Sequence, residues 1–307
     1  LILQNIYPDK WNLLYKYFKN NTTQIHESNI NIVSSDAYTL TDGPTIFMAN
    51  DIDKIAKFYL KSAKIPETTI QNLLKEIEMN TSITTEIHKL EKDYEDLDVR
   101  ENEKKKEQET IRKGKQETGT TKITPEMKTI KNKINILLSK IKPIMLDNSY
   151  IPNKKAHLDK WSKDKDIENT FTSNISEDTI IRIAKLTDIQ ATWKILLIMG
   201  IGVFTQHSSI AYTEIMKELA ESQHLFMIVA SSDYIYGTNY QFCHGYISKD
   251  LSNMTQEKTI QAMGRIGRNK MQQQYSIRFR NDDIIHKLFI FQKHRPEVIN
   301  INKLFIS

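Results

Sequence analysis

Residues 225–239 read LFMIVASSDYIYGTN, and this stretch decides the fold class. Six apolar residues, Leu225 to Ala230, form a strand-like run that ends in a polar, glycine-containing loop. A second apolar run, Trp193 to Met199, also resembles a strand, and an amphipathic helical pattern follows each run. We therefore predict two buried strands that are separated by helices.

A third unit with the same form lies earlier in the chain. Thr45 to Met48 make a short strand, and Asp51 can cap a helix that begins at Ile52. Strands that alternate with helices favour a mainly parallel sheet. The predicted fold class is α/β, a parallel sheet flanked by helices.

The segment between these units has a helical pattern of its own. Apolar residues recur at heptad spacing from Ile83 to Leu97 and again from Met127 to Ile141. Thr124 and Pro125 mark the start of the second helix, as N-cap and first helical residue. We predict an α-helical coiled-coil hairpin over about residues 70–142, inserted into the α/β domain.

Composition sets limits on the classes of function. The 43 basic and 38 acidic residues give a net charge of +5, which is compatible with a polyanionic partner but does not require one. No run of about 18 apolar residues occurs, so we expect no membrane span. The single cysteine, Cys243, cannot form an internal disulfide, and the eight histidines show no metal-ligand spacing.

The strongest motif is QAMGRIGR at residues 261–268, which fits the pattern QxxGRxGR. The residues before it predict a short helix with Thr255 as its N-cap, and the two glycines end that helix. Arg265 and Arg268 are therefore expected at a glycine-flanked helix end. Two guanidinium groups in this position suit a polyphosphate ligand, while pairing with a surface carboxylate is the ordinary structural alternative.

A second candidate site is the loop that follows Ala230. Ligands bind at the carboxyl ends of parallel strands in open α/β sheets. The hydroxyls of Ser231 and Ser232 could hold nucleic-acid phosphates, Gly237 permits a tight turn, and Asn239 can bond to backbone or ligand. An ordinary strand-to-helix turn uses the same residue types.

In order and spacing, this loop and the QxxGRxGR motif resemble motifs V and VI of superfamily 2 helicases. The resemblance implies a RecA-like domain in which Arg265 and Arg268 are arginine fingers for the γ-phosphate and Gln261 contacts the nucleotide or nearby motifs. It also assigns further residues to the nucleotide site: Gly237, Asn239 and Gly264. The residues that it assigns to nucleic-acid binding are Ser231, Ser232, Gly202 and Thr205.

The resemblance also divides the chain into domains. It implies a connector at 1–42, a RecA-like C-terminal domain formed by 43–66 and 186–307, and a helical insertion at 67–185. The segments YGTNY at 236–240 and AYTLTDGP at 37–44 are similar to helicase-like proteins of giant nucleocytoplasmic DNA viruses. With no membrane span and no signal-sequence pattern in the sequence, we expect an intracellular location, and the viral similarity implies the host cytoplasm, virus factory or virion.

Two elements of a complete nucleotide site are missing from the sequence. It has no GxxxxGK[ST] phosphate cradle and no DExx magnesium carboxylate. The resemblance implies that ATP and Mg²⁺ are bound jointly with an N-terminal RecA-like lobe of the same parent chain, so that this segment alone is inactive. DNA or RNA is the expected partner.

Two other interpretations remain open. The chain could be a catalytically silent RecA-like module whose hairpin binds a protein partner in a viral transcription or replication complex. Alternatively, lysines 104–106 and 113–115 at the hairpin tip could clamp duplex nucleic acid, although the charge-rich residues 98–116 are more typical of a solvated helix tip.

Overall fold

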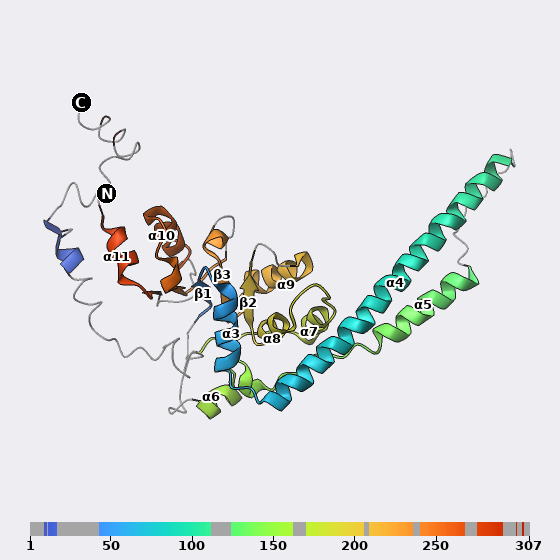
Figure 1. Ribbon diagram of the computed structural model, residues 1–307, viewed down its shortest axis with the longest axis horizontal. Coiled ribbons are helices and arrows are strands. Elements are labelled where there is room, and N and C mark those ends of the chain that lie inside the picture. The colour runs from blue at the N-terminus through green and yellow to red at the C-terminus, as the bar shows by residue number, and fades with distance from the viewer. Residues whose placement is uncertain are drawn as a thin grey trace.

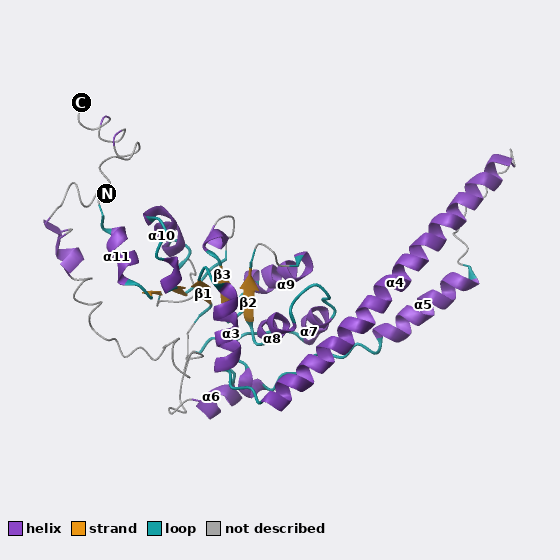
Figure 2. Ribbon diagram, viewed as in Figure 1, coloured by secondary structure: helices purple, strands orange, loops and turns teal. Residues whose placement is uncertain are grey.

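The computed structural model describes residues 9–10, 12–16, 43–111, 124–161, 170–205, 209–235, 240–267, 275–290, 299 and 303. Short strands lie at the centre of a mostly helical molecule (Figure 2). The strands are β1 (Thr45–Met48), β2 (Ile201–Phe204), β3 (Met227–Ala230), β4 (His244–Ile247) and β5 (Ser276–Phe279). The α-helices are α3 (Ile52–Ser62), α4 (Glu67–Ile111), α5 (Pro125–Leu138), α6 (Lys155–Trp161), α7 (Glu177–Ala184), α8 (Ala191–Ile198), α9 (Ile210–Glu221), α10 (Gln256–Met263) and α11 (Asp282–Leu288). The short 3-10 helices are η1 (Asn148–Tyr150), η2 (Ser232–Ile235) and η3 (Lys249–Leu251).

The five strands form one sheet in the order β2-β3-β1-β4-β5, and every neighbouring pair is parallel. The predicted parallel α/β sheet is therefore confirmed. Because all strands point the same way, their carboxyl ends lie along a single edge of the sheet. The loops that leave β1, β2, β3 and β4 meet at this carboxyl edge.

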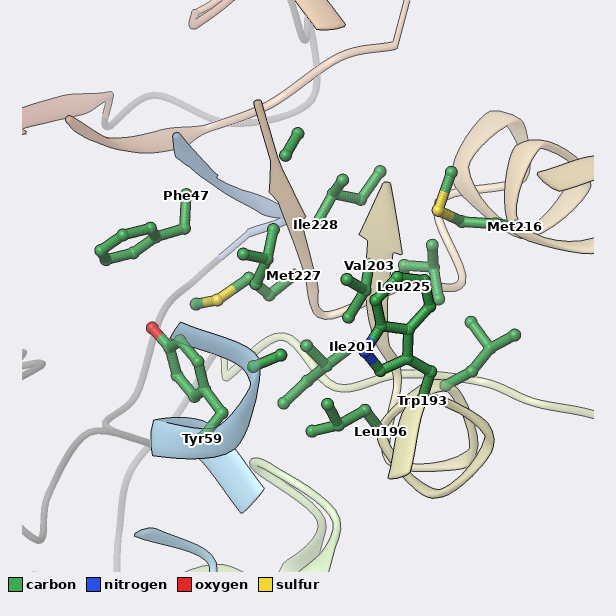
Figure 3. Packing of buried hydrophobic residues seen from close by; sticks show 14 of the residues in the cluster. Phe47, Tyr59, Trp193, Leu196, Ile201, Val203, Met216, Leu225, Met227 and Ile228 are labelled. Carbon is green, nitrogen blue, oxygen red and sulfur yellow. The ribbon is translucent and has the colours of Figure 1, made fainter. Parts of the chain in front are cut away.

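The strand register separates the two faces of the sheet. Ile46, Gly202 and Gly245 share one cross-strand row, and a side chain on Gly202 would point at Met216 of α9, so this is the α9 face. Phe47 points the opposite way and packs edge-on against Tyr59 of α3, which defines the α3 face. Figure 3 shows the buried side chains gathered around the strands, with Tyr59 and Met216 on different helices.

One sequence prediction is wrong. The apolar run from Trp193 to Met199 is not a strand, because residues 191–198 form α8 and the strand begins three residues later at Ile201. Every residue from Trp193 to Ile198 is buried. A helix that is buried all round carries no polar stripe, so its sequence looks like that of a buried strand.

The predicted helix starts are confirmed where the structure describes them. The side chain of Asp51 accepts a hydrogen bond from the Lys54 backbone at 3.0 Å and begins α3. Thr124 caps α5 in the same way, with Pro125 in the first turn. The hydroxyl of Ser209 caps α9 and accepts a hydrogen bond from the Tyr212 backbone at 3.3 Å.

Helices α4 and α5 contact each other and extend away from the sheet (Figure 1). With 45 residues, α4 is about 68 Å long. At its base Leu73 and Ile77 belong to the same buried cluster as the sheet, while Asn80 bonds the backbone of Lys142 through both amide atoms, at 2.9 and 3.2 Å. The predicted heptad positions are half-buried or buried, and a supercoiled pairing of the helices stays a prediction.

Candidate functional site

The first half of the QxxGRxGR motif lies on α10. The hydroxyl of Thr255 accepts a hydrogen bond from the Lys258 backbone at 3.3 Å, as expected for the N-cap. Thr259 and Ala262 face the core, and Gln261 is exposed. The side chain of Gln256 donates to the carbonyl of Leu288 at 2.7 Å, which ties α10 to α11. The helix that presents the motif is therefore fixed at both its start and its buried face.

The turn after α10 is held against β4. The Arg265 backbone bonds to Ala262 at 3.1 Å, and Ile266 forms an isolated parallel bridge with Phe242. The Ile266 side chain fills the space above Gly245, where an added Cβ would lie only 2.0 Å from its Cδ1. Glycine at 245 is therefore what allows the centre of the motif to approach the strand so closely.

Gly267 completes this turn. Its φ of +79° is a conformation that L side chains rarely adopt, and its N–H donates to the Phe242 carbonyl at 2.9 Å. Gly264 differs, because its φ of −67° is helical and an added Cβ would make only ordinary contacts. Arg265 is half-buried, and the two residues that follow it, Ile266 and Gly267, are held in place by contacts with the strand. Gly264, which precedes it, needs no special backbone conformation.

Some predicted site residues fall outside the part of the chain that the structure describes. They are Arg268, Gly237 and Asn239. Their roles stay predictions.

The hydroxyl residues predicted for nucleic-acid binding meet at a different place, the carboxyl edge. Thr205 follows β2, and Ser231 and Ser232 follow β3. All three line an open pocket of about 620 Å³ at this edge. Its other described lining residues are Asn50, Asp51, Ile52, Asp53, Asp188, Ile189, Gln190, Trp193 and Asp233.

The loop after β1 is fixed to the loop after β4. One carboxylate oxygen of Asp250 accepts hydrogen bonds from the backbones of Asn50 and Asp51, at 3.1 and 2.9 Å. The Asn50 amide donates in return to the Asp250 carbonyl at 2.7 Å. These bonds hold one wall of the pocket in place.

The charge of the pocket is negative. The described lining residues include four aspartates and no lysine or arginine. Asp233 pairs with Lys258 of α10 at 3.3 Å, and Asp51 is engaged as the α3 N-cap. An acidic lining repels phosphate groups and suits neutral or cationic hydrogen-bond donors. The serine and threonine hydroxyls are therefore poorly placed to hold a phosphate here.

The pocket at the carboxyl edge and the turn that contains Arg265 lie near opposite ends of α10. Asp250, shortly before α10, bonds to the carboxyl-edge loop, whereas Phe242, which bridges the motif turn, precedes the amino end of β4. The pocket and Arg265 are thus separate sites. Gly202 belongs to neither, because it is buried in β2 and an added Cβ would lie 2.9 Å from Met216 Cγ.

Sequence reasoning missed most of the pocket wall. Asn50 and Asp51 directly follow a predicted strand, so the strand-end rule could have identified them. Asp188 and Gln190 come from the segment that leads into α8, and Trp193 comes from the first turn of α8; no local pattern connects these residues with β3. The indole N–H of Trp193 makes no hydrogen bond among the described residues, although the ring packs near Tyr212 with centroids 6.2 Å apart.

Behind this wall lies a buried lysine. Lys194 is 1% exposed, and its ammonium group donates to the carbonyl of Leu186 and, at 3.3 Å, to the hydroxyl of Thr81 on α4. Burial lowers the pKa of Lys194 to about 8, and the opposing effect of Asp188 is smaller. One charged group therefore connects the base of the hairpin, α8 and the segment that lines the pocket.

Neither a metal site nor a membrane span is found among the described residues. They contain no group of three or more histidine, cysteine, aspartate or glutamate side chains that could hold a metal ion. None of their helices combines the length and apolar character needed to cross a bilayer. Compared with models of known families and with curated proteins, the chain matches none.

Proposed function

We propose that the chain is the C-terminal RecA-like lobe of a superfamily 2 nucleic-acid helicase or translocase. The five-stranded parallel sheet flanked by helices supports this proposal, since it is consistent with a RecA-like fold. The order of β3, its hydroxyl-bearing loop, β4 and then the QxxGRxGR helix supports it further. Arg265 and Arg268 would stabilise the charge that develops on the γ-phosphoryl group during transfer.

The observation that carries the proposal is the anchoring of the turn that contains Arg265. An arginine accelerates phosphoryl transfer when it is held in place before the reaction, because no reorganisation is then needed. Ile266, the residue directly after Arg265, packs over Gly245, and the backbone N–H of Gly267 donates to the Phe242 carbonyl. These two contacts fix the turn. A surface arginine with only a structural role does not need such an anchor.

In this proposal the chain supplies half of the nucleotide site. An N-terminal RecA-like lobe would hold the phosphates and Mg²⁺, since the sequence lacks the phosphate cradle and the DExx carboxylate. Closure of the two lobes would bring Arg265 to the γ-phosphate, and opening would release it. ATP binding would thereby be coupled to movement along nucleic acid.

The acidic pocket changes the role expected of Ser231, Ser232 and Thr205. If nucleic acid enters it, the hydroxyls and aspartates would meet sugar hydroxyls or base N–H groups, not phosphates. The phosphates would then need positive charge elsewhere on the lobe.

The test is nucleic-acid-stimulated ATPase activity of the protein that carries both lobes. Arg265→Ala and Arg268→Ala should each lower kcat by about 10³-fold or more, as loss of an arginine finger does in general. Arg182→Ala is the matched control, because Arg182 is exposed and pairs with Glu218 at 2.7 Å, on α7 and α9. Wild-type kcat in both finger variants would overturn the proposal.

A second function is favoured by the shape of the hairpin. Helices α4 and α5 project from the sheet as one arm, which is how a module without catalysis could hold a protein partner (Figure 1). Removing residues 85–137 and joining Thr84 to Leu138 with a short Gly-Ser link keeps Leu73, Ile77 and Asn80 in the core. Lost partner binding with intact ATPase activity would assign the arm to docking, whereas ATPase activity lost with the arm would contradict a purely accessory role.

The charge of α4 bears on whether the arm could clamp duplex nucleic acid. Over its full length, Glu67–Ile111, α4 carries 13 acidic and seven basic residues, and three of the basic residues are the lysines at 104–106. A helix with this excess of negative charge is repelled by the phosphate backbone. The net negative charge of α4 disfavours phosphate contacts along most of its length, while a clamp through the lysines at 104–106 and 113–115 stays a prediction, and the second of these groups lies outside the described residues.

A further inference from the structure

The α3 face of the sheet changes character between its two halves. Over β2, β3 and β1 it presents apolar side chains such as Val203 and Phe47. Over β4 and β5 the same face is polar, and we call these residues the polar strip: His244, Tyr246, Ser276, Arg278 and Arg280. Polar groups on an inward sheet face need polar partners, because burying them unpaired is costly.

Part of the polar strip is satisfied internally. His244 Nδ1 and Ser276 Oγ lie 2.8 Å apart, within hydrogen-bonding distance. The guanidinium of Arg278 lies over the ring of Tyr246, with its Cζ 5.6 Å from the ring centroid. His244 and Ser276, at the amino-terminal half of the strip, are therefore hydrogen-bond partners of each other, while Tyr246, Arg278 and Arg280 carry the polar groups of the carboxyl half.

The hydroxyl of Tyr246 is the exception in this strip. The side chain is 1% exposed and stacks on Phe47, with ring centroids 5.8 Å apart and planes 19° from parallel. Its hydroxyl is buried and has no hydrogen-bond partner among the described residues. A buried hydroxyl without a hydrogen bond lowers stability, and a phenylalanine would fill the same space without this penalty. We therefore expect the hydroxyl to have a hydrogen-bonding partner.

The surroundings of this hydroxyl are positively charged. Burial raises the pKa of Tyr246, and the nearby charges of Arg278 and Arg280 partly oppose that shift. The phenol therefore stays protonated at neutral pH and can donate. Arg280 follows β5 directly, is half-buried, and makes no side-chain hydrogen bond or ion pair with a described residue.

We propose that Tyr246, Arg278 and Arg280 form a binding site for a phosphate group. One phenol and two guanidinium groups offer several donors to a single tetrahedral anion, and arginine matches phosphate oxygens in pairs. The site lies apart from the Arg265 turn, which packs on the α9 face, and apart from the acidic pocket. The phosphate could belong to a nucleic-acid backbone or to free polyphosphate, and both offer the same oxygens.

The test measures binding of two probes to this chain. Inorganic pyrophosphate is titrated by calorimetry, and a fluorescent 20-nucleotide single strand by anisotropy. Tyr246→Phe and Arg280→Gln should each raise the Kd of the probe that uses the site by about tenfold, the usual effect of one charge-assisted hydrogen bond. Arg182→Gln, which alters an exposed arginine on α7, should leave both Kd values unchanged.

The pattern of losses identifies the ligand. If the variants bind the oligonucleotide more weakly, the site is assigned to a nucleic-acid backbone, whether or not pyrophosphate binding also weakens. If only pyrophosphate binding weakens, the site is assigned to free polyphosphate. Tyr246→Phe without a probe should melt at or above the wild-type temperature, which separates lost binding from lost folding. Wild-type affinity of both variants for both probes, or no binding by the wild type, would overturn the proposal.

Discussion

Lys194 in the core of the protein should make stability depend on pH in an unusual direction. The side chain is 1% exposed and donates to Leu186 and Thr81, with no carboxylate among its described hydrogen-bond partners. Its pKa in the folded protein is about 8, compared with 10.5 for an ordinary lysine, because burial disfavours the charged form. Lys194→Met keeps a similar volume and removes the charge.

The magnitude follows from the two pKa values. Below pH 8 the lysine is charged in both the folded and the unfolded chain, so the folded state carries the whole cost of the buried charge. Between pH 8 and 10.5 the unfolded chain binds more protons, so stability rises with pH. From pH 7 to pH 10 the wild type should gain about 2.5 kcal/mol from this group, at about 1.4 kcal/mol per pKa unit.

The assay is urea denaturation of wild type and Lys194→Met at several pH values between 7 and 10. The stability of the variant relative to wild type should be highest at pH 7 and should fall by about 2 to 3 kcal/mol by pH 10. The buried tyrosines titrate in both proteins and cancel in this difference. A difference that stays constant over this range would show that Lys194 does not titrate near pH 8, and would refute the reasoning.

Substitutions at three further positions test the anchors of the candidate site and of the hairpin. Gly267→Ala should cost about 1 to 2 kcal/mol in urea denaturation, because φ there is +79°, and an unchanged midpoint would mean that the turn relaxes freely. Asn80→Leu should cost about 2 to 4 kcal/mol, since it leaves the Lys142 N–H and carbonyl without partners, and proteolysis of the hairpin should quicken; equal proteolysis rates would count against this anchor. Thr255→Ala should cost about 1 kcal/mol through loss of the α10 cap, whereas Thr255→Ser should cost little, and equal losses in both would contradict a capping role.

Local chemistry made part of the fold predictable. The Asp51 cap, the Thr124 and Pro125 start of α5 and the Thr255 cap all depend on hydrogen bonds within three residues. Because these bonds join residues that are close in the sequence, the residue types that form them can be recognised from the sequence alone. The parallel sheet was predictable for a related reason, because strands separated by helices have few other ways to pair.

Burial on all sides hid the identity of α8. A half-buried helix shows an apolar stripe, but α8 is enclosed by the sheet, α3 and α7, so Trp193 to Ile198 carry little periodicity. The only charge in that stretch, Lys194, faces inward and bonds to α4. Such a contact depends on a residue more than one hundred positions away, which no local pattern reveals.

The candidate site was predictable only where a motif is continuous in sequence. Gln261, Gly264 and Arg265 come from one segment, so the pattern QxxGRxGR located them together. The pocket draws on four separate segments, and its negative charge comes from aspartates that no motif connects. The role of Gly245 was equally hidden, since it depends on Ile266 approaching from beyond the next helix.

A crystal structure of the two-lobed protein with ADP, aluminium fluoride and a single strand tests the central proposal most directly. Arginine fingers contact the transferring group in the transition state, which aluminium fluoride imitates. We predict that a guanidinium nitrogen of Arg265 lies within about 3 Å of a fluoride, with Ile266 still seated over Gly245. An Arg265 side chain directed away from the nucleotide, or paired with a carboxylate of its own lobe, would contradict the proposed function.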